Sequence, residues 1–306
     1  MLSEKKISVV ILTYNSKTLI KDCLHSVFLY NDIADSLEVI VVDNNSVECE
    51  SMFNWIRETY GDSVLLIKNC QNGGYGQGNN IGVQAASSPI VLIMNPDVRL
   101  VNPMFSKVFH IYEKDADVAI VGMKQLIDGT SCAPSINLLM DDNSNLYPIY
   151  GLFSVFFTLF ANKLINYFDL YNSKKMFIHG SCFFIRKDYF IEAGMFDENI
   201  FMYCEEKDLH RRLFSLKNSL KNIYLKSICY RHLIGERKIY FNGCKVYLDS
   251  EIYYARKHSL SVKNILYYNL YRYYILKFIA KMKRIDVYEY DKIIEDIRMK
   301  KRNILT

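Results

Sequence analysis

Four short runs rich in β-branched residues alternate with helix-like segments over residues 7–94. Each run is largely apolar, which is typical of a strand buried on both faces of a parallel sheet. Between the runs, apolar residues recur at helical spacing. The four runs are Ile7–Leu12, Leu37–Val42, Val64–Lys68 and Ile90–Met94. This alternation predicts an α/β fold, a Rossmann-like, doubly wound and mostly parallel sheet.

Polar residues follow three of these runs. They are Thr13-Tyr14-Asn15, Asp43-Asn44-Asn45 and Asn95-Pro96-Asp97. Because ligands of open α/β sheets bind outside the carboxyl ends of the strands, we expect these loops to line a ligand crevice. A carboxylate there, such as that of Asp97, is suited to hold Mg²⁺ or Mn²⁺ against a diphosphate. Taken alone, Asn-Pro-Asp is more often an ordinary turn after a strand.

A glycine-rich segment follows the third run. Residues 72–78 read Asn-Gly-Gly-Tyr-Gly-Gln-Gly, and they are predicted to form a turn before a helix over residues 79–86. No register of this segment gives G-x-G-x-x-G, and no G-x-x-x-x-G-K-S/T motif occurs in the chain. The sequence therefore argues against a dinucleotide fingerprint and a P-loop.

Carboxylates gather after a further predicted strand over residues 177–185. Five of them are Asp197, Glu198, Glu205, Glu206 and Asp208, the last three in a predicted helix over 203–216. Clustered carboxylates raise one another's pKa, which makes a general base plausible. Acidic residues at a helix start are equally expected from the helix dipole. Further on, His232 stands alone in Tyr230-Arg231-His232-Leu233, and by itself such a histidine is more often structural than a ligand.

Positive charge and tyrosine concentrate in the last third of the chain. The net charge is +5, but from Arg211 onward 22 Lys and Arg residues stand against 8 Asp and Glu, and 13 of the 24 tyrosines lie there. A basic, aromatic tail suggests an anionic partner, either lipid headgroups or nucleic acid. A solvated basic helix is the alternative, and residues 259–284 are predicted to form a long helix.

Residues 143–162 carry no charge and include a dense aromatic stretch. Their continuous apolar part is shorter than the roughly 20 residues that span a bilayer. We therefore expect either a buried core helix or an in-plane interfacial element, within a hydrophobic insertion over residues 130–175. The eight cysteines are scattered singly and no export signal is recognised, which favours a reduced, cytoplasmic setting.

Taken in order, these motifs resemble those of family 2 glycosyltransferases, over about residues 6–235. The Asn-Pro-Asp form and the Gly-Asn-Asn-x-Gly turn are most similar to the bacterial rhamnosyltransferase branch. The segments that carry the resemblance are Val10–Asn15, Val41–Ser46, Asn72–Gly82, Asn95–Asp97, His179–Arg186 and Phe196–Leu209.

The resemblance implies a GT-A fold that transfers a sugar from a nucleotide diphosphate with inversion. On the donor side it assigns Thr13, Tyr14, Asn15, Asp43, Gly74, Asn79 and Asn95 to the nucleotide. Asp97 matches the last Asp of the D-x-D metal motif, whose first Asp is Asn95 here, and His232 matches a histidine that completes the metal or diphosphate site. The implied cofactor is therefore a divalent cation, Mg²⁺ or Mn²⁺.

On the acceptor side the resemblance assigns the general base to Glu206, where the family has Asp. Glu205 is the lesser candidate for the base, and Asp197, Gly180 and Ser181 are expected to shape the acceptor side. The expected division is a GT-A domain over residues 1–235 and a basic, Tyr-rich helical extension over residues 236–306.

The expected donor is dTDP-rhamnose and the expected acceptor a lipid-linked oligosaccharide of O antigen or capsule synthesis. The protein would then be peripheral on the inner face of the cytoplasmic membrane, held to its anionic surface and with no nucleic-acid partner. A UDP-hexose donor is one alternative. A catalytically silent, membrane-associated scaffold is the other, motivated by Asn95 and Glu206 standing where the family has Asp.

Overall fold

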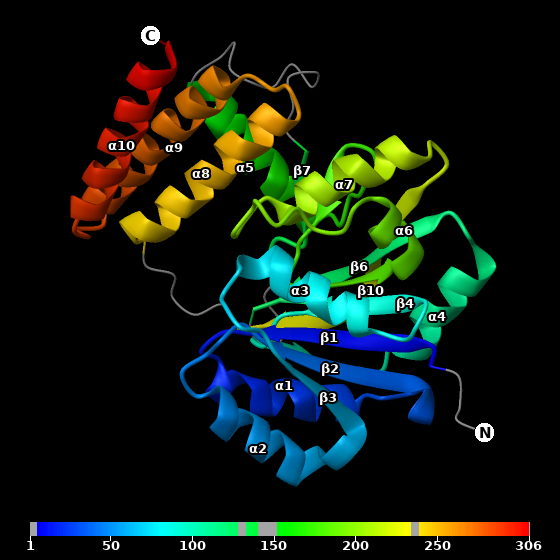
Figure 1. Cartoon of the computed structure of the whole chain (residues 1–306). Coiled ribbons are helices and arrows are strands. Elements are labelled where there is room, and N and C mark those ends of the chain that lie inside the picture. The colour runs from blue at the N-terminus through cyan, green and yellow to red at the C-terminus, as the bar shows by residue number, and fades with distance from the viewer. Residues whose placement is uncertain (1–4, 128–132, 140–151, 234–238, 306) are drawn as a thin grey trace.

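The computed structural model describes residues 5–127, 133–139, 152–233 and 239–305. An eight-stranded sheet runs through the larger part of the molecule, and a group of helices lies beside it (Figure 1). The strands of this sheet are β1 (Ile7–Thr13), β2 (Leu37–Asp43), β3 (Val64–Lys68), β4 (Ile90–Met94), β5 (Val98–Leu100), β6 (Val118–Leu126), β9 (Cys182–Arg186) and β10 (Lys221–His232). Their order is β3-β2-β1-β4-β9-β6-β10-β5. The predicted α/β sheet is confirmed.

Parallel pairing dominates the first half of the sheet. β1 lies between β2 and β4, β2 pairs with β3, and all three pairings are parallel. β9 runs antiparallel to both β4 and β6, and β5 runs antiparallel to β10. The predicted strand over 177–185 is wrong as a single element. Residues Met176–Ile178 form β8, which pairs with β7 (Ile136–Leu138) in a separate two-stranded sheet.

Helices cover both faces of the large sheet. Alternate side chains of β1 point to opposite faces, so Val9 and Ile11 pack on one layer and Val10 on the other. The first layer holds α1 (Lys17–Leu29), α2 (Cys49–Tyr60) and α4 (Phe105–Lys114), and the second holds α3 (Gly74–Ala85), α6 (Lys187–Glu192) and α7 (Glu205–Leu216). This explains why the strands are apolar on both faces.

The glycine-rich segment is helix rather than turn, because α3 already begins at Gly74. A Cβ on Gly78 or Gly82 would overlap the side chain of Leu12 or Val10. On the other side of the helix, a Cβ on Gly74 would overlap the backbone of Phe201, and Gly74 has φ +90°. The glycines let α3 fit between the sheet and the 196–201 segment, which the sequence alone did not reveal.

Four further helices form the group beside the sheet. They are α5 (Leu152–Tyr167), α8 (Phe241–Lys257), α9 (Val262–Met282) and α10 (Tyr288–Leu305). α5 packs against α9, so part of the predicted insertion joins the C-terminal helices. The rest of that insertion lies partly outside the described residues, as does the predicted boundary at 235/236. Among the described residues, no helix combines the length and apolar composition needed to cross a bilayer.

Candidate active site

The carboxyl ends of β1 and β2 form a tightly bonded corner. Thr13 and Asp43 are register partners in the parallel pair, and the Thr13 hydroxyl donates to Asp43 Oδ2 over 3.0 Å. Asp43 also accepts from the amide and the hydroxyl of Ser46, at 2.8 and 2.6 Å. Asp43 is fully buried, so the structure shows it holding the loop. Its predicted contact with a nucleotide stays a prediction.

The loop after β1 presents its next two residues outward. Tyr14 is 50% exposed, and Asn15 has φ +50°, a left-handed conformation that asparagine tolerates. The Asn15 amide donates to the Ser46 hydroxyl over 2.7 Å, and its side-chain oxygen accepts from the Val47 amide over 3.2 Å. Tyr14 and Asn15 therefore flank the Asp43 corner, as their assignment to one site requires.

Two residues assigned to the nucleotide are engaged in packing within α3. Gly74 lies against the Phe201 carbonyl, and its own carbonyl accepts from the Asn44 side chain over 2.9 Å. Asn79 is fully buried, and its side-chain nitrogen donates to the Tyr75 carbonyl over 2.9 Å. Asn44, one of the polar residues expected in the loop after β2, thus joins that loop to the start of α3.

Asp97 and His232 meet across an antiparallel strand pair. Val98 of β5 is the register partner of His232 of β10, which brings Asp97 Oδ1 to 3.2 Å from His232 Nε2. The Leu233 amide donates to the Asp97 carbonyl over 2.9 Å. Within the described part of the chain, Asp97 Oδ1 and both ring nitrogens of His232 are buried without a hydrogen-bond partner. Apart from the 3.2 Å contact between Asp97 and His232, these three polar atoms have no partner among the described residues, and such atoms suit binding of a cation.

A divalent cation fits these two side chains as protein ligands. The described residues hold no group of three or more His, Cys, Asp or Glu side chains placed to bind a metal. Mg²⁺ in nucleotide sites is commonly held by one or two carboxylates together with substrate phosphates, so a two-residue site suits it. Asn95 supplies no carboxylate. Its backbone N–H donates to the Ser181 carbonyl over 2.9 Å.

The carboxylate of Glu206 lies against the segment that follows β8. Glu206 Oε1 accepts from the Gly180 amide over 3.1 Å, and a Cβ on Gly180 would overlap the Glu206 side chain. The Tyr75 hydroxyl donates to the Gly180 carbonyl over 2.6 Å. Gly180 is therefore fixed from both sides. Tyr75 was missed as a site residue, although its place within the glycine-rich run was a usable signal.

The Ser181 side chain is hydrogen-bonded within the core and does not face a crevice. It is 1% exposed, and its hydroxyl bonds with Gln125 Oε1 and the Tyr230 hydroxyl at 2.9 and 2.8 Å. Through its carbonyl it also holds the Asn95 amide. The 180–181 segment thus has Glu206 on one side and the loop that carries Asp97 on the other.

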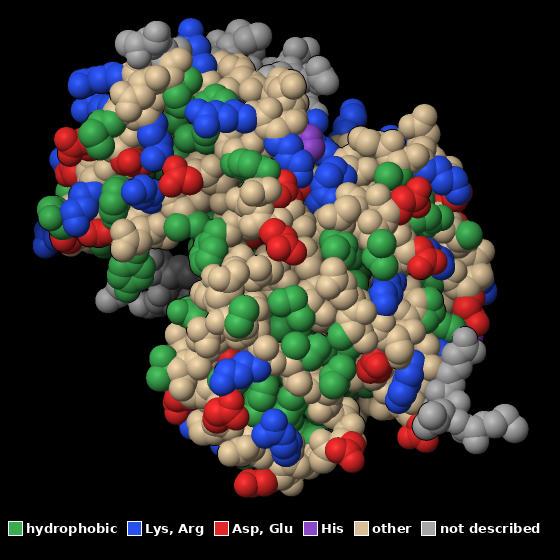
Figure 2. All heavy atoms as spheres, in the orientation of Figure 1, with side chains coloured by type: hydrophobic (Ala, Val, Ile, Leu, Met, Phe, Trp, Pro, Cys, Tyr) green, Lys and Arg blue, Asp and Glu red, His purple; other side chains and the backbone are tan. Residues whose placement is uncertain are grey.

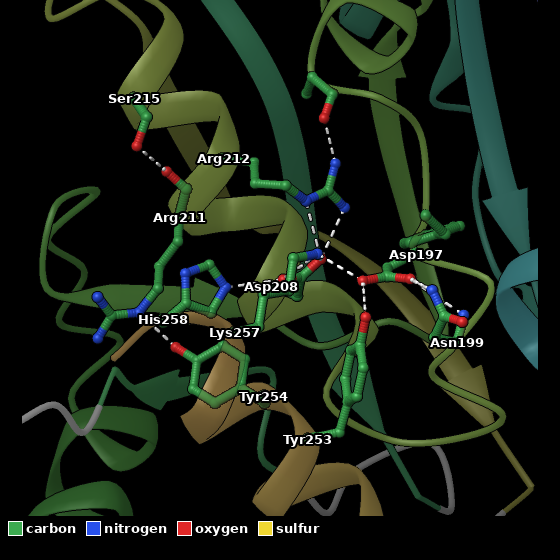
Figure 3. Close-up of polar contacts among 12 residues, drawn as sticks. Asp197, Asn199, Asp208, Arg211, Arg212, Ser215, Tyr253, Tyr254, Lys257 and His258 are labelled. Carbon is green, nitrogen blue, oxygen red and sulfur yellow. Dashed lines mark hydrogen bonds and ion pairs between the residues drawn. The ribbon is translucent and has the colours of Figure 1, made fainter. Parts of the chain in front are cut away.

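Asp197 belongs to an ion cluster between α7 and α8 (Figure 3). Asp197 Oδ2 accepts from Lys257 over 2.6 Å and from the Tyr253 hydroxyl over 2.9 Å. Burial raises the pKa of Asp197, but bonds from Lys257, Asn199 and Tyr253 outweigh it and hold the pKa well below its ordinary value. Asp208 is bound by Lys257, Arg212 and His258 at 2.7–2.8 Å. The cluster anchors α7, and an acceptor role for Asp197 stays a prediction.

Comparison with known proteins identifies the family. The sequence profile of "Glycosyl transferase family 2" matches residues 8–194. The chain belongs to this family. The GT-A fold expected from the motifs is confirmed, and family membership supports a glycosyltransferase.

Two relatives are similar in sequence. Rhamnosyltransferase WbbL of Escherichia coli (strain K12) is 27% identical over 234 residues, covering 66% of this chain and 82% of WbbL. Poly(ribitol-phosphate) beta-glucosyltransferase of Bacillus spizizenii is 30% identical over 93 residues. That match covers 30% of this chain and only 15% of the relative.

A solved structure shares the fold at low sequence identity. The mannosyltransferase PcManGT from Pyrobaculum calidifontis, in complex with GDP-Man and Mn²⁺, aligns with a TM-score of 0.56 and 16% identity. The alignment covers 83% of this chain and 64% of PcManGT. PcManGT binds a nucleotide sugar and Mn²⁺, which is consistent with a divalent cation as the cofactor of this fold.

Glu205 differs sharply from its neighbour Glu206. It is 3% exposed, and within the described part of the chain its Oε1 has no hydrogen-bond partner. Burial, and next the negative charge of Glu206, raises the pKa of the Glu205 carboxyl well above its ordinary value. Glu206 is only half-buried, so of the two carboxylates it is the one accessible to a substrate.

Replacing Glu205 by Gln should stabilise the protein at pH 8 and change its stability little near pH 4. The native carboxyl keeps its proton to higher pH than the unfolded chain does. The free energy of unfolding therefore falls as pH rises above about 4.3, and Gln avoids this loss. We expect the Tm at pH 8 to rise by about 2–4 °C, measured by calorimetry at both pH values. An equal shift at both would contradict this explanation.

Proposed function

We propose that this protein is an inverting glycosyltransferase that transfers rhamnose from dTDP-rhamnose to a lipid-linked glycan in surface polysaccharide synthesis. One observation carries the proposal. The 180–181 segment links the two candidate groups, because Gly180 is hydrogen-bonded to the Glu206 carboxylate and Ser181 to the backbone N–H of Asn95, two residues before Asp97 of the Asp97–His232 pair. A base and a diphosphate-binding pair that are linked through one short segment suit a single displacement at a sugar carbon.

Glu206 would accept the proton of the acceptor hydroxyl as that oxygen attacks C1 of the sugar. A carboxylate hydrogen-bonded by one backbone amide keeps free lone pairs for this proton. Gly180, fixed by Tyr75, would hold the carboxylate in place, because misplacement of a base by about 1 Å costs rate. The bond from C1 to the diphosphate breaks as the new bond forms, and inversion follows from attack on the opposite face.

Asp97 and His232 would hold a divalent cation beside the leaving diphosphate. When bound, the cation would neutralise charge that develops on the departing oxygens. Among the described residues, Asp97 Oδ1 and both ring nitrogens of His232 make no hydrogen bond, which supports this assignment. Thr13, Tyr14, Asn15 and Asp43 would line the nucleotide end of the same crevice.

The donor and acceptor are proposed from similarity and chemistry. Similarity to a rhamnosyltransferase over 66% of this chain supports rhamnose, and similarity to a glucosyltransferase keeps a UDP-hexose as the second candidate. We also propose that residues 1–235 form the catalytic unit and 236–306 an extension. The enzyme would be cytoplasmic and peripheral on the inner face of the membrane.

Calorimetric titration with dTDP, UDP and GDP, each with Mn²⁺ and then with EDTA, tests the proposal. We expect dTDP to bind at least about tenfold more tightly than the others, a difference of about 1.4 kcal/mol, and only with Mn²⁺. Preference for UDP would keep the reaction class and change the sugar. Failure to bind any of them, with or without Mn²⁺, would favour the silent scaffold.

A further inference from the structure

The turn between α9 and α10 exposes large apolar side chains. Phe278, Met282, Ile285 and Tyr288 are 65%, 72%, 54% and 60% exposed. Other apolar residues of the same helices are buried against one another and α8, including Leu266, Tyr273, Ile293 and Ile297. The exposed residues are therefore not needed to hold the two helices together. An exposed apolar cluster of this kind marks an interaction site.

Exposed cations outnumber exposed carboxylates around these apolar residues, with Lys281, Lys283 and Arg284 against Asp286. The side chains of Lys281, Lys283 and Arg284 are exposed and form no ion pair within the described part of the chain. Lys277, one turn earlier, is paired with Asp291 of α10. We call the seven residues Phe278, Lys281, Met282, Lys283, Arg284, Ile285 and Tyr288 the hairpin tip. Apolar side chains among unpaired cations match the boundary between lipid tails and anionic headgroups.

The hairpin tip lies on the same side of the molecule as the candidate active site. In Figure 1, the α9–α10 turn and the carboxyl ends of β1 and β2 both lie at the left of the view. Figure 2 shows hydrophobic and Lys or Arg side chains next to one another on the helical part of the molecule, at the left of the same view. A flat surface contacted by the hairpin tip would therefore lie on the side of the molecule where β1 and β2 end.

We propose that the hairpin tip docks this protein on anionic phospholipid. The inference rests on the proposed function in one respect, because docking would bring the crevice to a lipid-linked acceptor. A second copy of the chain fits the tip less well. A symmetric contact would bring Lys281, Lys283 and Arg284 of each copy together, with Asp286 as the one exposed carboxylate of the turn to offset three cations. The exposed aromatic face of α5 has one cation within the helix, Lys163, so it offers weaker attraction to headgroups.

Flotation with phosphatidylcholine vesicles, with and without phosphatidylglycerol, tests the proposal on the full chain. We expect salt-sensitive binding only when phosphatidylglycerol is present. The triple variant Lys281→Gln, Lys283→Gln, Arg284→Gln should bind about 100-fold more weakly, since each cation near an anionic surface contributes about fivefold. The double variant Phe278→Ser, Met282→Ser should lose about tenfold or more through reduced apolar burial.

Matched controls alter the same residue types elsewhere on the surface. Leu29→Ser with Leu65→Ser changes two exposed apolar residues of the sheet part, and Lys174→Gln with Lys175→Gln removes two exposed cations. Both controls should float like the native protein. Every variant is also titrated with dTDP in the presence of Mn²⁺. The hairpin-tip variants should bind dTDP with native affinity, because none of the substituted residues is assigned to the nucleotide or metal site.

Three results would overturn the docking proposal. The first is native-like flotation of both tip variants. The second is loss of flotation in Phe156→Ser with Phe160→Ser, which would move the docking surface to α5. The third is a native dimer that the tip substitutions dissociate, without vesicle binding. Failure of the proposed function looks different: the protein floats as expected and binds no nucleotide.

Discussion

Replacing Glu206 by Gln should lower kcat for sugar transfer by about 10²–10⁴-fold, the usual contribution of a general base. The amide oxygen of Gln can still accept the bond from the Gly180 amide, so the local structure should persist. Gln cannot take a proton from the acceptor hydroxyl, so the chemical step slows while substrate binding stays. Steady-state kinetics should therefore show a fall in kcat with little change in KM for the donor.

Glu205→Gln is the matched control, since it makes the same substitution at the adjacent, buried position. We expect it to retain most transfer activity, because Glu205 is only 3% exposed and cannot reach an acceptor. Equal Tm values for native protein and Glu206→Gln would exclude unfolding as the cause of lost activity. Near-native turnover by Glu206→Gln together with an inactive Glu205→Gln would transfer the base to Glu205.

Replacing Asp97 by Asn should abolish the Mn²⁺-dependent part of nucleotide binding, a loss of about 100-fold or more. Asn keeps the shape of the side chain but removes the charge that attracts a divalent cation beside a diphosphate. His232→Gln should weaken binding by about tenfold, because a neutral nitrogen ligand is lost and the carboxylate remains. Isothermal titration of nucleoside diphosphate with Mn²⁺ and with EDTA measures both effects.

Asp62→Asn is a suitable control for these titrations, since Asp62 is an exposed carboxylate in the short helical turn before β3. It should bind nucleotide like the native protein under both conditions. If Asp97→Asn showed the same affinities as the native protein in Mn²⁺ and in EDTA, the metal assignment to Asp97 and His232 would be wrong. The family assignment and the fold would be unaffected.

The first half of the fold was predictable because its signals are local. Runs such as Val39–Val42 are apolar on both faces, and this by itself indicates a strand between two helical layers. The polar residues that end β1, β2 and β4 then follow from their position after each run. Parallel strands put these ends at one edge, and the observed Thr13–Asp43 pairing agrees with that prediction.

The later elements were harder to predict because their pairing is non-local. β9 inserts between β4 and β6 in antiparallel orientation, and no periodicity in residues 177–185 shows that the chain changes sheets at Gly180. The glycines of α3 resembled a turn, since glycine is unfavourable within a helix. Close approach to Val10, Leu12 and Phe201 explains them, and that is visible only once the layers are assembled.

The candidate site likewise has features that the sequence predicted and features that depend on non-local packing. The sequence by itself singled out the candidate residues, because Asp97, Glu206 and His232 stand where the resemblance to the family places site residues. Only the tertiary structure decided which of them meet: the β5–β10 pairing joins Asp97 to His232, and packing of α7 on the Gly180 segment separates buried Glu205 from accessible Glu206. Strand character depends on neighbours along the chain, whereas contacts between distant side chains depend on how whole layers pack.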